Sequence, residues 1–389
     1  MLMKFLRKGK HYLVAVVAYW FYGRPSRRLI VVGVTGTKGK STTCRLIASV
    51  LEAGGFKVGL LSTVEFQIGE KRWLNDKKMT MLGLGQIQKM LHEMVVAGCQ
   101  YAVVETSSEG IMQYRHYGLN YDIAVFTNLG TEHSERHGGF ENLKQAKGQL
   151  FAGLQSYRKN FAGQKIKKIS IANVDDEHAG FFLGFPADEK WGFGLTASEF
   201  KEKNIIGKIE SMENGQPIFS VGEEKYGLNI IGDFNVYNAL AAIAVGKSQG
   251  LNAGQIATGL LSVKQVEGRM EFVDCGQDFK VVVDYAHEPM SLTALFKTLK
   301  NLVAPENGKV IAVIGSDGGG RDVSKRGKMG RVAGELADLV VVTDVNCFDE
   351  DPRAIAEMLA AGAREAGKND GQNLFIEVDR RQGIERAIK

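Results

Sequence analysis

The sequence predicts an α/β protein: a P-loop-type central domain with a mostly parallel sheet, followed by a Rossmann-like C-terminal α/β domain. Three observations lead to this fold class. A β-branched run at residues 29–34 enters a Gly-rich turn and then a helical stretch, which is how a phosphate-binding α/β unit begins. Apolar runs and helical stretches then alternate, as in parallel sheets covered by helices on both faces. The same alternation starts again after residue 266.

Length and composition are those of a folded chain with two or three domains. The 389 residues are 44% hydrophobic and 24% charged, which is a globular composition. The net charge of +5 is small for this length, so it favours anionic ligands such as nucleotides and indicates no nucleic acid. The four cysteines are scattered without a C-x-x-C pair, which suits buried thiols in a reducing, cytoplasmic compartment.

Short apolar runs between turns predict the buried strands of the central domain. They are residues 29–34, 101–105, 123–127 and 169–172. Helical spacing predicts helices at residues 41–53, 85–97 and 235–249. Between residues 190 and 232 the pattern changes to short alternating runs, at 217–221 and 226–231, which indicate an antiparallel patch at the edge of the sheet.

The C-terminal pattern predicts a second set of strands and helices. The strands are residues 280–284, 310–315, 339–343 and 374–378, and the helices are 291–302, 329–337, 354–366 and 383–389. We therefore expect three parts: a short apolar and basic helical segment at 1–28, the central ATP-binding domain at 29–266, and the C-terminal domain at 267–389.

Residues 12–22 form an unbroken run of eleven aliphatic and aromatic residues with basic residues on both sides. A helix that spans a bilayer needs about 20 apolar residues, so this run is too short to cross one. It has the length of a signal-peptide core, but no small-residue cleavage site follows. Two alternatives remain. We favour a helix packed on the next domain over an interfacial helix at the inner membrane surface, for which Tyr19, Trp20 and Tyr22 would be suited.

The strongest local signal is the run GTKGKS at residues 36–41, between a predicted strand and a predicted helix. Backbone N–H groups of a Gly-rich turn at a helix N-terminus form an anion cradle. Lys40 is placed to reach the β- and γ-phosphates of a nucleotide, and the Ser41 hydroxyl to ligate Mg²⁺. The general P-loop pattern has glycine at position 34, where this sequence has Val34 next to Gly33.

The wider run TGTKGKST resembles the ATP-binding loop of the Mur ligase family, and the resemblance continues through nearly the whole chain. It is closest to the members that add the third residue of the peptidoglycan stem peptide. The matching motifs, in family order, are YGRPS at 22–26, ETSS at 105–108, Gln113 with Arg115, Thr127 and Asn128 with His133, Lys147 in QAKGQLF, GDFNVYN at 232–238, GRME at 268–271, DYAH at 284–287, and GGRD with KR at 319–326.

This resemblance implies a reaction in which ATP phosphorylates a carboxylate and an amine then attacks the acyl phosphate. It implies four catalytic residues, namely Lys40, Glu105, His133 and Lys147. Ser41 and Glu105 would hold a first Mg²⁺. His133 and Lys147 would hold a second, with Lys147 as a carbamate because a plain ammonium would repel the cation.

The remaining binding residues also come from the resemblance. It assigns ATP to Gly36, Thr37, Lys38, Gly39, Lys40, Ser41, Thr42, Asn128, Asn235, Asn238, Arg269 and Asp284. It assigns the amino acid and the peptide or muramyl-peptide acceptor to Thr80, Ser107, Ser108, Gln113, Arg115, His287, Arg321 and Asn346.

Three departures from the family pattern concern the substrates. Only 28 residues precede the first strand, where the family has a uridine-binding domain, so we expect another acceptor or a separate uridine-binding partner. The family's T-T-P and S-S-H appear as TML at 80–82 and SSE at 107–109. Its D-N-P-R appears as VNCF at 345–348, so Phe348 stands where an arginine would bind diaminopimelate. Two alternatives therefore stay open: a ligase acting on a polyglutamate or lipid-linked carboxylate, and a non-catalytic nucleotide-binding subunit.

Overall fold

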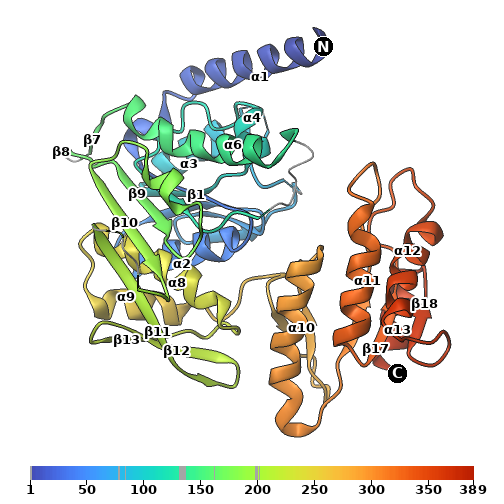
Figure 1. The fold of residues 1–389 in the computed structure, drawn as a ribbon. Helices are drawn as coiled ribbons and strands as arrows, with labels where there is room; N and C mark the ends of the chain where they lie inside the picture. The colour runs from blue at the N-terminus through green and yellow to red at the C-terminus, as the bar shows by residue number, and fades with distance from the viewer. Residues whose placement is uncertain are drawn as a thin grey trace. The chain divides into compact units, whose positions relative to one another are not determined.

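The computed structural model describes residues 2–77, 79–83, 85–130, 137–161, 163–197, 200 and 202–389, with the backbone alone for 2–8 and 10. The chain forms two compact units, Met1–Glu267 and Gly268–Lys389 (Figure 1). The predicted fold class is confirmed, because each unit carries parallel strands covered by helices.

The first unit is built on one sheet in which eleven strands are described, in the order β13-β12-β11-β10-β9-β6-β1-β5-β2-β3-β4. At its centre, β1 (Ile30–Thr35) lies parallel between β5 (Tyr101–Glu105) and β6 (Ile123–Phe126). The other strands are β2 (Val58–Leu61), β3 (Glu65–Ile68), β4 (Lys71–Leu74), β9 (Ile169–Asn173), β10 (Glu189–Gly194), β11 (Lys203–Glu213), β12 (Gln216–Val221) and β13 (Glu224–Gly227). Because β1, β5 and β6 are parallel neighbours, the loops after them meet at one edge.

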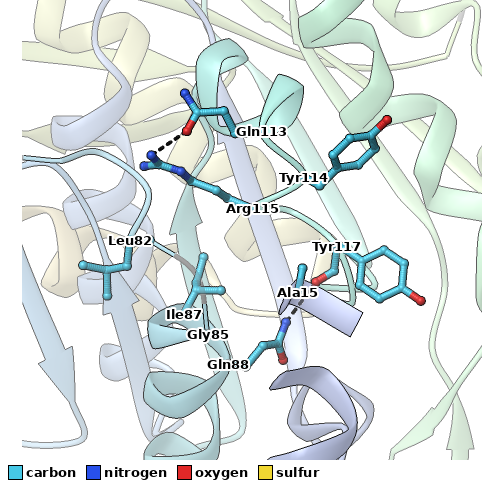
Figure 2. A pocket seen from close by; sticks show the side chains of 10 residues that line it. Ala15, Leu82, Gly85, Ile87, Gln88, Gln113, Tyr114, Arg115 and Tyr117 are labelled. Atoms are coloured by element: carbon cyan, nitrogen blue, oxygen red, sulfur yellow. Dashed lines mark hydrogen bonds between the residues drawn. The ribbon is translucent and has the colours of Figure 1, made fainter. Parts of the chain in front are cut away.

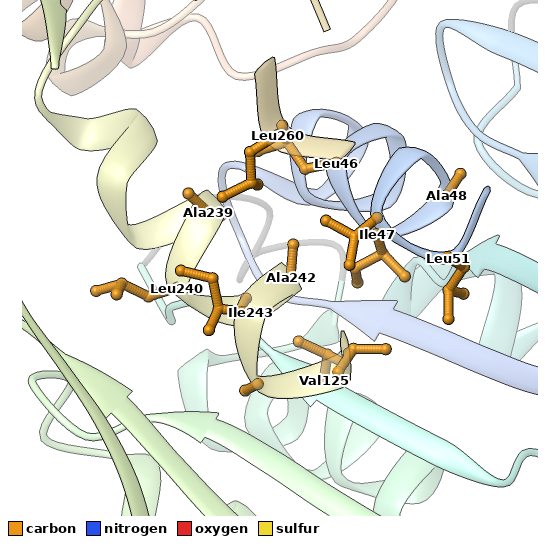
Figure 3. Close-up of a cluster of buried hydrophobic side chains, with 14 of the residues drawn as sticks. Leu46, Ile47, Ala48, Leu51, Val125, Ala239, Leu240, Ala242, Ile243 and Leu260 are labelled. Atoms are coloured by element: carbon orange, nitrogen blue, oxygen red, sulfur yellow. The ribbon is translucent and has the colours of Figure 1, made fainter. Parts of the chain in front are cut away.

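The central strands are buried on both faces because helices cover both sides of the sheet. One face packs against α2 (Lys40–Ala53), α8 (Phe234–Ser248) and α9 (Ala253–Ser262), whose apolar side chains interlock in Figure 3. The other face packs against α3 (Gln86–Val96), α4 (Ser108–Met112), α6 (Phe140–Ala152) and α7 (Ala179–Leu183). The two cores hold the strand ends, and so the loops of the site, in place.

A buried carboxylate ties the start of β1 to β6. Asp122 is fully buried and lies 2.6 Å from Lys159 Nζ and 2.9 Å from Lys168 Nζ. It also accepts a hydrogen bond from the backbone N–H of Val31. Burial lowers the pKa of Lys159 to about 8. These contacts pair a charge that would be costly to bury alone.

The N-terminal segment is a helix, α1 (Leu2–Phe21), that packs on the first unit with one face. Ala15, Ala18 and Tyr19 are buried, and the Tyr19 hydroxyl accepts hydrogen bonds from Arg27 Nε at 3.2 Å and Asn120 Nδ2 at 3.1 Å. The prediction that the segment packs as a helix on the next domain is thus confirmed for the side of α1 that carries Ala15, Ala18 and Tyr19. Within the described part of the chain, no helix has both the length and the apolar composition needed to cross a bilayer.

The second unit has a three-stranded parallel sheet in the order β16 (Ile311–Ile314), β17 (Leu339–Val342), β18 (Leu374–Ile376). Its helices are α10 (Pro289–Val303), α11 (Ser324–Leu336), α12 (Pro352–Glu365) and α13 (Arg380–Ile388). The strand predicted at 280–284 is β15 (Val281–Val283), which pairs antiparallel with β14 (Glu271–Val273) outside that sheet.

Most predicted elements agree with the structure to within one or two residues, but three do not, and one of these is the helix predicted from residue 383, which begins at Arg380. The strand predicted at 226–231 ends at Gly227, because the chain turns away before Gly232, which has a positive φ of 104°. The helix predicted from residue 329 begins at Ser324. Other elements were not predicted, among them α9, β2, β3, β4, β10 and β14, and the smaller β7 (Asn160–Phe161), β8 (Gln164–Lys165), η1 (Pro25–Arg28), η2 (Gly153–Ser156) and η3 (Ala304–Glu306).

Candidate active site

The phosphate loop, residues 36–39, joins β1 to the N-terminus of α2, as the sequence predicts. Gly39 has a positive φ of 77°, and a Cβ there would lie 2.3 Å from Asn238 Oδ1. Only glycine therefore allows α8 to approach the loop this closely. The loop ends at the first turn of a fourteen-residue helix, and a helix N-terminus favours an anion.

The loop after β6 shapes the phosphate loop. Asn128 accepts hydrogen bonds from two backbone N–H groups of the phosphate loop, those of Thr37 at 2.8 Å and Lys38 at 2.9 Å. The Thr127 hydroxyl donates to the Lys38 carbonyl at 2.7 Å, and Gly130 N–H donates to the Thr37 hydroxyl at 2.9 Å. Asn128, predicted to bind ATP, thus holds the loop that would bind it.

Glu105 lies at the end of β5, directly beside the first turn of α2. Its Oε2 atom accepts hydrogen bonds from the Ser41 hydroxyl at 2.9 Å and from the Thr63 backbone N–H at 2.7 Å. The Thr63 hydroxyl in turn donates to the Thr80 hydroxyl at 2.9 Å. The structure therefore brings Ser41, Glu105 and Thr80 into one connected group of oxygen atoms.

Two lysines flank the phosphate loop. Lys40 Nζ donates to the Thr37 carbonyl at 2.9 Å, which folds the side chain over the loop. Lys147, on α6, donates from Nζ to the Gly36 carbonyl at 2.7 Å, and only 4% of the residue is exposed. The structure thus places both predicted catalytic lysines at the loop, Lys40 from its C-terminal end and Lys147 from α6.

Asparagines on α8 form the floor under the loop. Asn238 accepts a hydrogen bond from the Thr43 hydroxyl at 3.0 Å and donates to Asn235 Oδ1 at 2.8 Å. Asn235 Nδ2 donates to the Ile231 carbonyl. Thr42, also predicted to bind ATP, is buried in the first turn of α2.

The predicted metal ligands are only partly described. Ser41 and Glu105 are side by side and offer oxygen atoms, the donor type that Mg²⁺ prefers. The Glu105 carboxylate is buried, and the two hydrogen-bond donors named above are both neutral groups, so a cation would offset the cost of burying it. This donor set fits Mg²⁺. His133, predicted for a second metal with Lys147, lies outside the described residues.

A small pocket lies beside the predicted acceptor residues (Figure 2). Gln113 and Arg115 contribute its polar side, with Arg115 Nη2 donating to Gln113 Oε1 at 2.6 Å. Burial lowers the pKa of the Arg115 guanidinium. The other lining residues come from α1, from the segment around α3 and from the turn after α4: Ala15, Leu82, Gly83, Gly85, Ile87, Gln88, Tyr114 and Tyr117. The predicted acceptor residues Ser107 and Ser108 begin α4, where the Ser107 hydroxyl accepts a hydrogen bond from Gly110 N–H.

The predicted ATP-side residues of the second unit lie around the β14–β15 pair. The Arg269 guanidinium stacks 4.6 Å from the Tyr285 ring centre. Asp284 accepts hydrogen bonds from the backbone N–H groups of Met270 and Ala286, and burial raises the pKa of its carboxyl. Burial lowers the pKa of the His287 imidazole, which favours its neutral form.

The predicted amino-acid residues Arg321 and Asn346 lie in the loops that follow β16 and β17. Both contact Asp317: Arg321 as an ion pair and Asn346 through Nδ2 at 3.0 Å. The Arg321 guanidinium lies 5.6 Å from the ring centre of Phe348, which is exposed. An arginine is therefore present in this cluster, although position 348 has none.

Sequence reasoning missed two residues that organise the site. Thr63 links Glu105 to Thr80, and it follows β2, a strand that was not predicted. The run VGLL at 58–61, after the glycines that end α2, was the available signal. Asp317 was also missed, although it stands next to the Gly-rich run that was noted.

Family models match both units. Residues 34–246 match the Mur ligase middle domain, and residues 268–389 match the Mur ligase glutamate ligase domain. This chain belongs to the Mur ligase family. As a Mur ligase, it is an acid–amino-acid ligase of the class that uses ATP, and the phosphate loop described above lies within the middle-domain match.

Individual relatives agree with this family. The ligase is 39% identical to a UDP-N-acetylmuramyl-tripeptide synthetase of Roseiflexus sp. (strain RS-1), over 96% of this chain and 74% of the relative. It is 36% identical to a UDP-N-acetylmuramoyl-L-alanyl-D-glutamate–2,6-diaminopimelate ligase of Bacillus cereus, over 96% and 73%.

Solved structures show the same fold. A structure of a UDP-N-acetylmuramoyl-L-alanyl-D-glutamate–2,6-diaminopimelate ligase matches with a TM-score of 0.60 at 28% identity, over 93% of this Mur ligase and 70% of that chain. A Mycobacterium tuberculosis folylpolyglutamate synthase complexed with ADP matches with a TM-score of 0.69, over 97% and 86%. At 16% identity, this second likeness concerns the fold alone.

Proposed function

We propose that this Mur ligase joins an amino acid to the free carboxylate of a muramyl peptide in the cytoplasm, with ATP and Mg²⁺. The observation that carries the proposal is the grouping of Lys40, Ser41, Glu105 and Lys147 around a phosphate loop. The names of the relatives at 36–39% identity supply the substrate class.

The reaction has two chemical steps. A carboxylate oxygen of the acceptor attacks the γ-phosphorus of ATP, the bond from that phosphorus to the β–γ bridging oxygen breaks, and ADP leaves. The amine of the incoming amino acid then attacks the acyl carbon of the acyl phosphate, inorganic phosphate leaves, and the amine loses a proton. Each amide bond therefore consumes one ATP and releases one ADP and one phosphate.

The residues of the site would act through position and charge, which is how most phosphoryl transfer is catalysed. Lys40 brings a positive charge to the transferred phosphoryl group. Ser41 and Glu105 would hold Mg²⁺, which neutralises phosphate charge when bound. Asn128 and Asn238 keep the loop in the shape that presents its N–H groups.

Lys147 is proposed to carry a carbamate. A buried lysine nitrogen that donates to the Gly36 carbonyl keeps one N–H for that bond after it is carboxylated, because a carbamate nitrogen retains one hydrogen. The two carbamate oxygens would then face the phosphate end of the site. His133 is proposed to share the second metal with them.

The pocket beside Arg115 is proposed to bind the acceptor. A guanidinium recognises carboxylate and phosphate groups through paired hydrogen bonds, and Gln113 holds this one from the side. Ser107, Ser108 and Thr80 would contact the peptide nearer to the phosphate loop. Arg269, Asp284 and His287 are proposed to complete the ATP and acceptor contacts, and Arg321 with Asn346 to bind the incoming amino acid.

A second candidate acceptor is a carboxylate without a uridine nucleotide, such as a lipid-linked precursor or a polyglutamate. The observation that favours it is the position of Ala15, which places α1 in the wall of the acceptor pocket. A separate uridine-binding partner is the corresponding proposal for a nucleotide-linked acceptor.

The decisive test measures phosphate release from ATP while the acceptor and the amine are varied independently. Phosphate release that requires both a UDP-muramyl dipeptide and an amino acid supports the proposal. Release that requires a lipid-linked or glutamyl acceptor supports the second candidate. ATP binding without release under any pair of substrates would contradict a ligase and indicate a nucleotide-binding subunit.

A further inference from the structure

One face of α1 remains uncovered by the first unit. Leu13, Val17 and Phe21 are 63%, 59% and 79% exposed, and Trp20 is 59% exposed. Their spacing of three and four residues places all four on one side of the helix. Ala15, Ala18 and Tyr19 form the opposite, buried side. The apolar face is thus turned away from the unit on which the helix packs.

The packing of α1 fixes this face in position. Tyr12 makes edge contacts with the rings of Tyr114 and Tyr117, at 5.4 and 5.1 Å between ring centres. Tyr19 contacts Tyr117 at 6.1 Å and is held by Asn120. The exposed side chains are therefore presented by an anchored helix.

The charge of the chain is concentrated in the same segment. Residues 1–28 contain seven basic residues and no acidic residue: Lys4, Arg7, Lys8, Lys10, Arg24, Arg27 and Arg28. The whole chain has 49 basic and 44 acidic residues, so the other residues hold 42 basic against 44 acidic and carry a net charge of −2. The surplus positive charge of the protein therefore comes from α1 and the turn that follows it.

An exposed apolar stripe between basic clusters matches the surface of an anionic membrane. Apolar side chains enter the boundary between headgroups and acyl chains, while Lys and Arg pair with lipid phosphates. Trp20, with the Arg24 guanidinium 4.5 Å from its ring centre, has the amphipathic character of a residue at that boundary. A second copy of the chain fits less well, because each α1 segment would bring seven positive charges to the contact.

We propose that α1 lies flat on an anionic lipid surface through Leu13, Val17, Trp20 and Phe21, and anchors the ligase there. The geometry requires no spanning segment. Because the buried side of the same helix lines the acceptor pocket through Ala15, the lipid surface would lie next to that pocket. The proposal is independent of the acceptor, since binding to lipid involves neither ATP nor the ligase reaction.

The test is co-sedimentation of the full chain with vesicles, without nucleotide. Vesicles of phosphatidylglycerol and phosphatidylcholine should bind the protein, and pure phosphatidylcholine should bind it at least about tenfold more weakly. The double variant Leu13→Ser and Val17→Ser should reduce binding to the anionic vesicles at least about tenfold. Replacing Lys4, Lys8 and Lys10 by Gln should also weaken binding and reduce its dependence on salt.

The matched control removes apolar groups that are also exposed but lie elsewhere in the first unit. Leu74→Ser with Met212→Ser, on β4 and β11, should leave vesicle binding unchanged. Equal loss in this control, or no binding of the unmodified protein to anionic vesicles, would overturn the proposal. So would a concentration-dependent dimer that disappears in the Leu13→Ser and Val17→Ser variant while vesicle binding persists.

Discussion

The Ser41 hydroxyl lies 2.9 Å from Glu105 Oε2, which joins the first turn of α2 to the end of β5. The two elements that present these oxygen atoms are the helix behind the phosphate loop and a neighbour of the central strand. Their contact makes the proposed metal site a direct product of the parallel arrangement of β1 and β5.

Glu105→Gln should raise the magnesium concentration needed for half-maximal phosphate release by about 10- to 100-fold. The amide can still accept from Ser41 and from Thr63 N–H, so the fold is kept while the negative charge is lost. A charged ligand interaction is worth about 1.5–3 kcal/mol, which corresponds to this range. Glu93→Gln, on the exposed face of α3, is the control and should titrate like the unmodified enzyme. An unchanged magnesium requirement in Glu105→Gln would remove Glu105 from the metal site.

Lys40→Ala should reduce substrate-dependent phosphate release by about 10²–10³-fold, comparable with the loss of one electrostatic donor in other active sites. The loss should appear in kcat, because the charge is needed most when the γ-phosphoryl group is transferred. Lys89→Ala, an exposed lysine on α3, controls for the loss of a positive charge. Near-normal turnover of Lys40→Ala would contradict the assignment of the phosphate loop.

Lys147→Ala should be nearly inactive and should regain activity when a short carboxylate such as acetate or formate is added. The added anion can occupy the position that the carbamate oxygens would leave at the phosphate end of the site. Activity should be titrated against each anion, with chloride at equal ionic strength as the control. An unmodified Nζ in a high-resolution map of an active preparation would refute the carbamate.

Gly39→Ala should weaken ATP binding at least about tenfold, because the new Cβ would meet Asn238 Oδ1 at 2.3 Å and displace the loop. Gly98→Ala is a matched control with the same φ of 77° and no atom within 4 Å of its Cβ. Both variants should lose about 1–2 kcal/mol of stability from the left-handed conformation. Only Gly39→Ala should lose ATP affinity, measured by calorimetry. Equal ATP affinity in the two variants would show that the contact with Asn238 does not shape the loop.

The ligase should prefer lysine or ornithine to meso-diaminopimelate. Asp344, Asp349, Glu350 and Asp351 lie within four residues of Phe348 in the sequence, where the family resemblance places an arginine, so we expect a distal ammonium to be favoured over a distal carboxylate. Phe348→Arg should raise kcat/KM for diaminopimelate about tenfold or more, from one charge-assisted contact. Initial rates with both amino acids check this. A clear preference of the unmodified enzyme for diaminopimelate would contradict this prediction. It would indicate that Arg321, which is already in the cluster, binds the distal carboxylate in place of an arginine at position 348.

The central strands and the phosphate loop were predictable because they depend on local pattern. Strands β1, β5, β6 and β9 are mostly apolar runs, and each is buried along its whole length. Strand β4 was missed because its sequence, KRWL, lies at the edge of the sheet and is largely exposed. An edge strand is specified by its partner more than by its own residues.

The site could be predicted only as far as strand order allows. Residues that end neighbouring parallel strands meet at one edge, which brings Glu105 and Thr127 to the phosphate loop. The contact of Thr63 with Glu105 depends on how two loops fold over the edge, and no periodicity in the sequence encodes that. The packing of Tyr19 against residues 117–120 is likewise a tertiary contact, so the sequence left two alternatives for α1.

Glu105 Oε2 accepts two hydrogen bonds, from Ser41 and from Thr63 N–H. A cation that uses this oxygen competes with both donors, so free magnesium gains little by entering alone. Magnesium that is already bound to a nucleotide would bring phosphate oxygens into the loop at the same time. Their contacts with the loop would offset the loss of the hydrogen bonds from Ser41 and Thr63. At the proposed metal site, the shared acceptor would thus favour the metal–nucleotide complex over the bare ion, so metal and nucleotide would enter as one ligand.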